Sequence, residues 1–386
     1  MRVTHFLHVD GPGGGPKVIR QLLEGLPPTW NQNLVHGGSG PLSAWCTKAG
    51  IATTQVPTAH PYVSLLHLGR VRRALLAHRP DIILLHGQWA GPIGSLALRK
   101  KPHPPAVYIS HCPAFYHSTN LARVVRNQIA ESLPCKRCAA VVTLSRRNHY
   151  NYLYRGWVME ERLHQICNGL DPDDLPSASE VAAIRRQYFL SPSQNAVFVG
   201  RLDEQKRVDW LIEAWDAALR DRCDSGGLPP WHLWIVGDGP ARRAVEQKRH
   251  HSLDPSTIHL IGSQPDGMSW IAAADVVVMS SLFEGHALVP LEAMACSKPV
   301  VSFDTDGIVD SVEHGKTGLL APLGECEALG KAIAALMNRP ALSVEMGRAG
   351  RERLIALFPL GNTISSYTTL LNRIVSHRAT PLPAAA

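Results

Sequence analysis

Two glutamates bracket the point where an apolar segment gives way to a helix-forming segment. The residues from Asp275 to Ser280 form a largely apolar run, the loop after it contains Glu284 and Gly285, and Glu292 follows in an Ala-, Leu- and Met-rich stretch. This change of pattern predicts a strand followed by a helix. We expect Glu284 at or just before the first helical residue and Glu292 about two turns further on.

The backbone at the start of this helix is an expected anion site. The N–H groups of Gly285, His286, Ala287 and Leu288 should point outward with the positive end of the helix dipole behind them, and such a terminus attracts phosphate. A ligand that is anionic in the middle and rich in hydroxyl groups on both sides fits this geometry, and a diphosphate between two sugars is such a ligand. A solvated surface Glu and a capping Glu would give the same pair, so the pair alone is a weak signal.

Two further loops follow predicted strands and carry groups suited to a diphosphate. Gly200 lets a ligand approach the backbone, while Arg201 offers a planar fork of donors and Lys206 a point charge. Gly237 and Gly239 follow the next strand, which is a natural place for the edge of a base or a ribose. Because the carboxyl ends of parallel strands meet at one edge of a sheet, we expect the three loops to converge.

The first half of the chain has its own candidates at the ends of predicted strands. Two short apolar runs end in His86 and His111, and we expect both at the carboxyl edge of a buried parallel sheet. His111 is the better candidate because a Cys-Pro pair stops its strand directly afterwards. Gly13 and Gly14 lie in a glycine-rich loop that we interpret as flexible and at the mouth of a cleft, although a tight turn without a ligand fits equally well.

Strands and helices alternate in both halves of the chain. This alternation predicts an α/β protein with two doubly wound Rossmann-like domains facing across a cleft, and two domains are also the expectation for 386 residues. Prolines cluster between residues 172 and 192. We therefore place the domains at 1–175 and 176–360, followed by a C-terminal helix and tail at 361–386.

The charge of the chain is unevenly distributed. Residues 1–175 hold 19 Lys and Arg against 9 Asp and Glu, a net +10, and the remaining residues hold 20 against 23, a net −3. Residues 120–155 interleave arginines with aromatic residues and a helical apolar stripe, which predicts peripheral contact with an anionic membrane. A core-facing helix with a solvated basic face has the same pattern. Single-stranded nucleic acid would also suit these residues, but no nucleic-acid module accompanies them and we expect no such partner.

Other features bear on location and on metals. The first residues do not form a signal-peptide pattern, and no 18 apolar residues run together. We expect a cytoplasmic protein with reduced cysteines, peripheral on the inner face of the cytoplasmic membrane where the basic region binds it. Cys135 and Cys138 have the spacing of a zinc half-site without a second pair nearby, and Asp304 and Asp306 are better explained as helix-capping residues, so we expect no metal.

Taken together, these segments resemble the nucleotide-sugar domain of glycosyltransferase family four, whose architecture is the GT-B double Rossmann fold. The first half matches more loosely, through the glycine loop, His111, Ser145 and Asn168-Gly169. The segments that carry the resemblance are GRLDEQK at 200–206, VGDGP at 236–240, AADVVVMSS at 273–281, FEGHALVPLEAMACSKPVV at 283–301 and EHGKTGLL at 313–320.

The resemblance implies a role for each candidate residue. Arg201 and Lys206 hold the donor diphosphate, Glu292 binds the ribose hydroxyls, Glu284 contacts the hydroxyls of the donor sugar, and His111 lies near that sugar. The reaction implied is a retaining one without metal or other cofactor, in which the leaving phosphate helps to deprotonate the acceptor and the positive groups stabilise its charge. Domain 1–175 is then the acceptor side and domain 176–360 binds the nucleotide sugar.

The function implied is transfer of a sugar from a nucleotide-diphosphate sugar to a glycan, lipid-linked or small-molecule acceptor, in the synthesis of cell-surface polysaccharide or glycoconjugates. A nucleotide-sugar epimerase and a non-catalytic partner protein of the same architecture are the alternatives. The chain departs from the family pattern at His286-Ala287, where members carry an aromatic residue and Gly, and at Asp306-Gly307 and Asp310, where they carry a glycine pair and Glu. We expect His286-Ala287 to influence the choice of donor.

Overall fold

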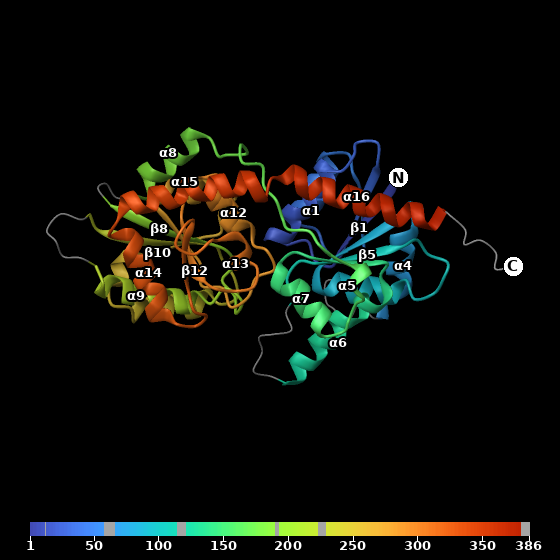
Figure 1. Cartoon of the computed structure of the whole chain (residues 1–386), viewed down its shortest axis with the longest axis horizontal. Coiled ribbons are helices and arrows are strands. Elements are labelled where there is room, and N and C mark those ends of the chain that lie inside the picture. The colour runs from blue at the N-terminus through green and yellow to red at the C-terminus, as the bar shows by residue number, and fades with distance from the viewer. Residues whose placement is uncertain (12, 58–65, 114–120, 190–192, 223–228, 380–386) are drawn as a thin grey trace. The chain divides into compact units, whose positions relative to one another are not determined.

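The chain folds as two compact α/β units in a computed structural model, which describes residues 1–11, 13–57, 66–113, 121–189, 193–222 and 229–379. The first unit comprises Met1–Asn168 and the chain from Gly361 onward, and the second comprises Gly169–Leu360. Each unit contains a parallel sheet with flanking helices (Figure 1), which confirms the predicted fold class. The division lies a few residues before the boundary that we placed after residue 175, and the C-terminal helix groups with the first unit.

Seven parallel strands form the sheet of the first unit, in the order β3-β2-β1-β4-β5-β6-β7. The order reverses between β1 and β4, and doubly wound sheets bind ligands outside the carboxyl ends of the strands at such a point. The strands are β1 Arg2–Leu7, β2 Asn31–His36, β3 Ala52–Gln55, β4 Ile82–His86, β5 Ala106–Ser110, β6 Ala140–Thr143 and β7 Leu163–Gln165. The helices are α1 Gly14–Gly25, α2 Pro41–Lys48, α4 Leu68–Leu76, α5 Gly87–Ala97, α6 Leu121–Arg137, α7 Arg146–Tyr154 and α16 Leu360–Ala379, with the short helix η1 Glu160–Arg162.

Both faces of the first sheet are covered, so its central strands are mostly apolar. On one face, Val3, Leu84 and Ile109 pack against α1 and against Tyr367 and Leu371 of α16. On the other face, side chains of β4 and β5 pack against helices α4, α5 and α6. Because both faces are buried, a polar side chain within the sheet needs a hydrogen-bond partner to offset the cost of its desolvation.

Six parallel strands form the second sheet, in the order β10-β9-β8-β11-β12-β13. Helices α9 and α14 lie side by side on one of its faces (Figure 1), where Leu211, Trp215 and Ile333 join the main core. The strands are β8 Gln194–Val199, β9 Trp231–Val236, β10 Ile258–Gly262, β11 Val276–Val278, β12 Val300–Phe303 and β13 Gly318–Ala321. The helices are α8 Ala178–Gln187, α9 Val208–Arg220, α10 Arg242–His250, η2 Pro255–Thr257, α11 Gly267–Ala273, α12 Leu288–Ala295, α13 Ile308–Ser311, α14 Cys326–Met337 and α15 Pro340–Leu357.

Candidate functional site

The loops that follow β8 and β9 interlock through their backbones. The N–H of Leu202 donates to the carbonyl of Asp238 at 3.0 Å. Gly237 has a φ of +145°, and a Cβ there would lie 1.8 Å from the carbonyl oxygen of Gly200, while a Cβ on Gly239 would lie 2.4 Å from that of Leu202. These two glycines are therefore required by the close approach of the loops to each other.

The loop after β11 joins the same group through a mostly buried ion pair. The Nζ of Lys206 lies 2.5 Å from Oε1 of Glu284, and the two side chains are only 13% and 7% exposed. Gln205 fixes the connection, since its carbonyl accepts from the N–H of Leu282 at 2.8 Å and its Nε2 donates to the carbonyl of Phe283 at 3.0 Å. The three loops thus converge at the carboxyl edge of the second sheet, as the sequence predicts.

Arg201 lies in the same loop as Lys206 but keeps much of its guanidinium in solvent. Its side chain is 52% exposed, and Nη2 lies 3.1 Å from Oδ2 of Asp203 and 3.3 Å from Oε1 of Gln205. A guanidinium has five N–H donors, so these contacts orient the group while leaving donors for an anionic ligand.

Helix α12 begins at Leu288, so Glu292 is its fifth residue and lies little more than one turn from the start. The predicted depth of about two turns is wrong. Pro290 supplies the reason, because a residue without an N–H fits only in the first turn, where no intrahelical partner is needed. Ala287 is the extended cap residue, and Glu292 is buried, at 8% exposure.

The backbone of the loop before α12 lies directly against Gly307, in the loop after β12. A Cβ on Gly307 would lie 2.0 Å from the carbonyl oxygen of Gly285, and the N–H of Gly307 donates to the carbonyl of Glu284 at 3.3 Å. The requirement for glycine at 307 therefore follows from packing under this loop. It does not depend on contact with a ligand.

The side chain of His286 turns into the interior of the second unit. It is 2% exposed, its Nε2 lies 3.2 Å from Oγ of Ser311, and its ring centroid lies 5.1 Å from that of Phe358. Burial lowers the pKa of this imidazole to about 4, so it is neutral at pH 7. The part of His286 that can meet a ligand is therefore its backbone N–H.

In the first unit, His86 is the last residue of β4 and His111 directly follows β5, at the expected edge of the sheet. His111 is half-buried, and its Nε2 lies 3.1 Å from Nδ1 of His86. Burial lowers the pKa of His111 to about 4. The ring lies beside Gly87, whose φ is +85° and whose added Cβ would lie 3.8 Å from the imidazole.

The glycine loop begins a helix earlier than expected. Helix α1 starts at Gly14, and Gly13 is its cap residue with a φ of +141°. A Cβ on Gly13 would meet nothing within 4 Å, so the backbone is open there. Asp10, three residues after β1, accepts hydrogen bonds from the N–H groups of Leu42 and Ser43 at the start of α2.

Comparison with known proteins assigns both halves of the chain. Residues 193–339 match the family model described as glycosyl transferases group 1, and residues 12–174 match glycosyltransferase family 4. The chain belongs to glycosyltransferase family four. It is a glycosyltransferase with the GT-B fold, as the sequence motifs predicted.

Individual relatives of this glycosyltransferase are distant. The D-inositol 3-phosphate glycosyltransferase of Pseudarthrobacter chlorophenolicus is 27% identical over 81% of this chain and 76% of that protein. The alpha-D-kanosaminyltransferase of Streptomyces kanamyceticus is 28% identical over 60% of each chain. The crystal structure of Anabaena HepE in complex with UDP-glucose superposes with a TM-score of 0.82, at 21% identity, over 97% of this chain and 100% of that one.

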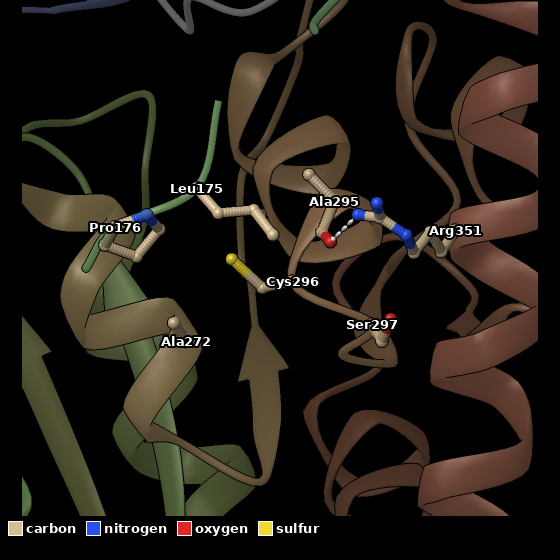
Figure 2. A pocket seen from close by; sticks show the side chains of 7 residues that line it. All are labelled: Leu175, Pro176, Ala272, Ala295, Cys296, Ser297 and Arg351. Carbon is tan, nitrogen blue, oxygen red and sulfur yellow. Dashed lines mark hydrogen bonds between the residues drawn. The ribbon is translucent and has the colours of Figure 1, made fainter. Parts of the chain in front are cut away.

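A pocket of about 270 Å³ lies at the carboxyl end of α12, where Ala295, Cys296 and Ser297 line it (Figure 2). Its one charged residue, Arg351, donates to the carbonyls of Pro172 and Ala295 at 2.7 Å and to Asp173 at 2.8 Å. This arginine thereby ties the first residues of the unit to α12. The pocket is smaller than typical ligand sites and its charge is already paired, so we do not assign it to the glycosyltransferase site. Its lining consists of Leu175, Pro176, Ala272, Ala295, Cys296, Ser297 and Arg351.

The predicted membrane-contact region includes α6, whose faces differ from those of a core helix. Leu121, Val125 and Ile129 are 75%, 46% and 58% exposed, whereas Asn127 and Glu131 are buried. These three apolar side chains therefore do not pack in the core, although Cys135 of the same helix does. No helix in the described part of the chain is long and apolar enough to cross a membrane.

Cys135 and Cys138 lie at the end of α6 and are both buried. Burial raises the pKa of both thiols, to about 12 for Cys138, which makes thiolate formation unfavourable at neutral pH. Within the described ranges, no cluster of His, Cys, Asp and Glu side chains has the arrangement of a metal site.

Sequence reasoning missed three polar residues that organise these sites. Gln205 links two loops of the second unit, and Gln32 and His5 form hydrogen bonds beneath His86. Gln205 stands within the segment GRLDEQK, so its position in a loop between two charged residues was a usable signal. Gln32 and His5 could have been recognised only from the register of the strands.

Proposed function

We propose that this glycosyltransferase moves a sugar from a nucleoside-diphosphate sugar to a glycan, lipid-linked or small-molecule acceptor with retention of anomeric configuration. The observation that carries the proposal is the ion pair of Lys206 and Glu284, with the exposed Arg201 on one side and the N–H groups of residues 285–288 on the other. This arrangement places positive groups next to a carboxylate, which matches a diphosphate joined to a sugar.

The two partners of the ion pair have different proposed roles. An ammonium group has three donors, so Lys206 can donate to Glu284 and also to a phosphate oxygen. Glu284, held in place by this contact, accepts hydrogen bonds from sugar hydroxyls. Arg201 binds the diphosphate, Glu292 the ribose hydroxyls, and the backbones of Gly200, Gly237 and Gly239 line the nucleotide.

In the proposed reaction, the bond between the anomeric carbon and the phosphate oxygen breaks while a bond to the acceptor oxygen forms on the same face of the sugar. The acceptor proton passes to the leaving phosphate. Arg201, Lys206 and the N–H groups before α12 stabilise the charge that develops on the diphosphate. The proposal requires neither a protein nucleophile nor a metal ion. In the first unit, we propose that His111 contacts a sugar hydroxyl and that Gly13, whose backbone is open, and Gly14 approach the substrate.

Relatives support this class of donor and acceptor. Crystal structures of Anabaena HepE contain UDP or UDP-glucose. Curated relatives include an inositol phosphate glycosyltransferase, a kanosaminyltransferase and a lipopolysaccharide core biosynthesis glycosyltransferase. These names favour small-molecule and lipid-linked acceptors, and we propose a role in the synthesis of cell-surface polysaccharide or glycoconjugates.

A thermal-shift screen across UDP-, GDP- and ADP-sugars tests the donor, because a ligand that binds only the folded protein raises its stability with saturation. The stabilising donor is then incubated with acceptors, and the anomeric configuration of the product is read by NMR with and without EDTA. Inversion of configuration, or loss of activity in EDTA, would contradict the proposed mechanism. Isomerisation of the sugar without any acceptor would favour the epimerase, and the absence of binding by every donor would favour a non-catalytic partner protein.

We also propose that α6 and α7 contact an anionic membrane on the cytoplasmic side. Leu121, Val125 and Ile129 form the exposed apolar stripe, and the exposed basic residues nearby are Arg126, Lys136, Arg137, Arg146 and Arg147. Salt-sensitive sedimentation with phosphatidylglycerol vesicles, weakened in an Ile129→Glu variant, is the expected result. Equal recovery with neutral and anionic vesicles would remove the idea.

A further inference from the structure

Four polar side chains cross the first sheet in a regular diagonal, and we call them the histidine ladder: Gln32, His5, His86 and His111. Oε1 of Gln32 lies 3.1 Å from Nε2 of His5, Nδ1 of His5 lies 3.1 Å from Nε2 of His86, and Nδ1 of His86 lies 3.1 Å from Nε2 of His111. Each contact between two rings thus joins the Nδ1 of one to the Nε2 of the next. The ladder connects a half-buried imidazole at the carboxyl end of β5 with an amide on β2, three strands away in the sheet.

Strand register explains why the ladder is regular. Gln32 on β2 lies opposite Val3, and His5 is two residues further along β1. His5 lies opposite Leu84, with His86 two residues further, and His86 lies opposite Ile109, with His111 two residues further. Because side chains alternate with a period of two, all four point to the same face of the sheet. The ladder therefore rises step by step from the amino end of β2 to the carboxyl end of β5.

Gln32 determines which nitrogen of each histidine carries the proton, and hence which group donates in each hydrogen bond of the ladder. Its Nε2 donates to the carbonyl of Leu23 at 3.0 Å, and a carbonyl can only accept, so Oε1 is the atom that faces His5. Nε2 of His5 must then carry the proton. A neutral imidazole has one donor and one acceptor nitrogen, so Nδ1 of His5 accepts from Nε2 of His86, and Nδ1 of His86 accepts from Nε2 of His111.

Burial keeps all three rings neutral, which this direction requires. It lowers the pKa of His5 and of His111 to about 4, and that of His86 well below its ordinary value. With the proton of His111 on Nε2, its Nδ1 has a lone pair and no hydrogen. Among the described residues, Nδ1 of His111 has no hydrogen-bond partner.

We propose that Gln32, His5 and His86 are positioning residues that hold His111 in the Nε2–H tautomer, so that its Nδ1 accepts a hydrogen bond from a hydroxyl of the substrate. This inference rests on the proposed function for the identity of the hydroxyl as one of the sugar. An acceptor nitrogen discriminates between chemical groups, because it attracts a hydroxyl donor and repels the oxygens of a phosphate or carboxylate. The ladder thus assigns His111 to the sugar and not to the diphosphate.

The ladder itself is tested without any ligand. Long-range ¹H–¹⁵N correlation spectra of the full chain, labelled with ¹⁵N-histidine at pH 7 and assigned by single substitutions, report which ring nitrogen carries the proton. We expect His5, His86 and His111 each to be protonated on Nε2 alone. A proton on Nδ1 of any of the three, or exchange of His111 between tautomers, would overturn the proposal.

Variants of Gln32 distinguish its effect on the histidine tautomers from a general effect on packing. Gln32→Met removes the acceptor and should leave His111 in a mixture of tautomers, whereas Gln32→Glu keeps an acceptor facing His5 and should preserve the Nε2–H form. Asn33→Ala is the matched control, since Asn33 is the next residue of β2, is buried, and bonds Val3 and Thr4 outside the ladder. An unchanged His111 spectrum in Gln32→Met, or an equal change in Asn33→Ala, would contradict the assigned role.

The proposed contact between His111 and the sugar is tested with the nucleotide sugar that stabilises the protein most in the donor screen. Its parent nucleoside diphosphate is the comparison. The Nδ1 resonance of His111 should move with the nucleotide sugar and stay unchanged with the diphosphate; equal movement with both would overturn the sugar assignment. With that donor, kcat/KM should fall about two- to tenfold in Gln32→Met and recover in Gln32→Glu. Absence of binding by any nucleotide sugar would refute the proposed function and, with it, the sugar assignment, whereas the tautomer result would stand.

Discussion

The polar groups at the carboxyl edges of the two sheets are held by different interactions, an ion pair in the second unit and neutral hydrogen bonds in the first. In the second unit, Lys206 and Glu284 are charged, paired and brought together by loops whose backbones touch at glycines. In the first unit, His5, His86 and His111 are held by neutral hydrogen bonds between strands. A charged pair suits a ligand that carries charge itself, whereas a neutral ladder fixes the position of a single proton.

Removing one partner of the charged pair should have the largest effect. Lys206→Met leaves Glu284 as an unpaired and nearly buried carboxylate, which we expect to cost about 3 kcal/mol of unfolding free energy and about 10²-fold or more in kcat. Urea denaturation and steady-state kinetics with the identified donor measure the two effects. The matched control is Lys248→Met, which breaks the surface pair with Glu213 and should change stability by less than about 1 kcal/mol.

The double variant Lys206→Met/Glu284→Gln distinguishes structure from chemistry. It removes the unpaired charge, so stability should return to within about 1 kcal/mol of the wild type, while activity stays low. If activity recovered together with stability, the pair would serve only the fold. The contrast between the two units would then lose its functional meaning.

Two glycines with nearly the same φ test how tightly each edge is packed. Gly237 has a φ of +145° and a Cβ there would strike Gly200, whereas Gly13 has a φ of +141° and open space around it. We expect Gly237→Ala to cost about 3 kcal/mol or more and Gly13→Ala about 1 to 2 kcal/mol, because only the first adds a steric clash to the backbone strain. Equal losses in thermal denaturation would show that conformation alone governs both positions.

The polar residues at the carboxyl edge of the second sheet could be predicted better than those of the first sheet. The former lie close together in the sequence, whereas the latter come from strands that are far apart in the sequence. Arg201 and Lys206 lie in one short segment after a strand, and the boundaries of a helix such as α14, Cys326–Met337, follow local periodicity. The contact between Gln32 and His5 depends on the register of parallel strands, which no local pattern specifies. Its direction further depends on a carbonyl at Leu23.

One error and one open alternative have equally physical causes. Glu292 lies nearer to the start of α12 than predicted, and Pro290 was a sufficient signal, because proline limits where a helix begins. In α6, the apolar stripe fitted either a membrane-facing or a core-facing helix, and the buried side of the helix contains Asn127 and Glu131. Burial of Glu131 is favoured by hydroxyl partners on other elements, Tyr108, Ser110 and Tyr152, and a helix pattern contains no information about them.

Low pH should lower the free energy of unfolding through protonation of the histidine ladder. The pKa values of His5 and His111 are lowered from 6.5 to about 4, so their stabilising contribution is fully present above pH 6.5 and is lost as the pH falls toward 4. We expect each of these two rings to contribute a loss of about 2 kcal/mol of unfolding free energy between pH 7 and pH 5 in urea titrations. A His86→Asn variant should show a shallower pH dependence. An identical slope in that variant would place the acid-sensitive groups outside the ladder.

The smallest effect should come from Glu131, a carboxylate buried in the first unit. Burial raises the pKa of Glu131, so the folded state holds its proton more tightly than the unfolded state, and ionisation destabilises the fold as the pH rises above about 4.3. Glu131→Gln removes this titration, and its stability relative to wild type should therefore increase with pH, by about 1.4 kcal/mol for each unit by which the pKa is raised. Exposed Glu161→Gln serves as the control in urea titrations from pH 4 to 7. A relative stability of Glu131→Gln that falls with pH would mean that hydroxyl donors keep Glu131 ionised, and the first unit would then depend on a buried charge as the second does.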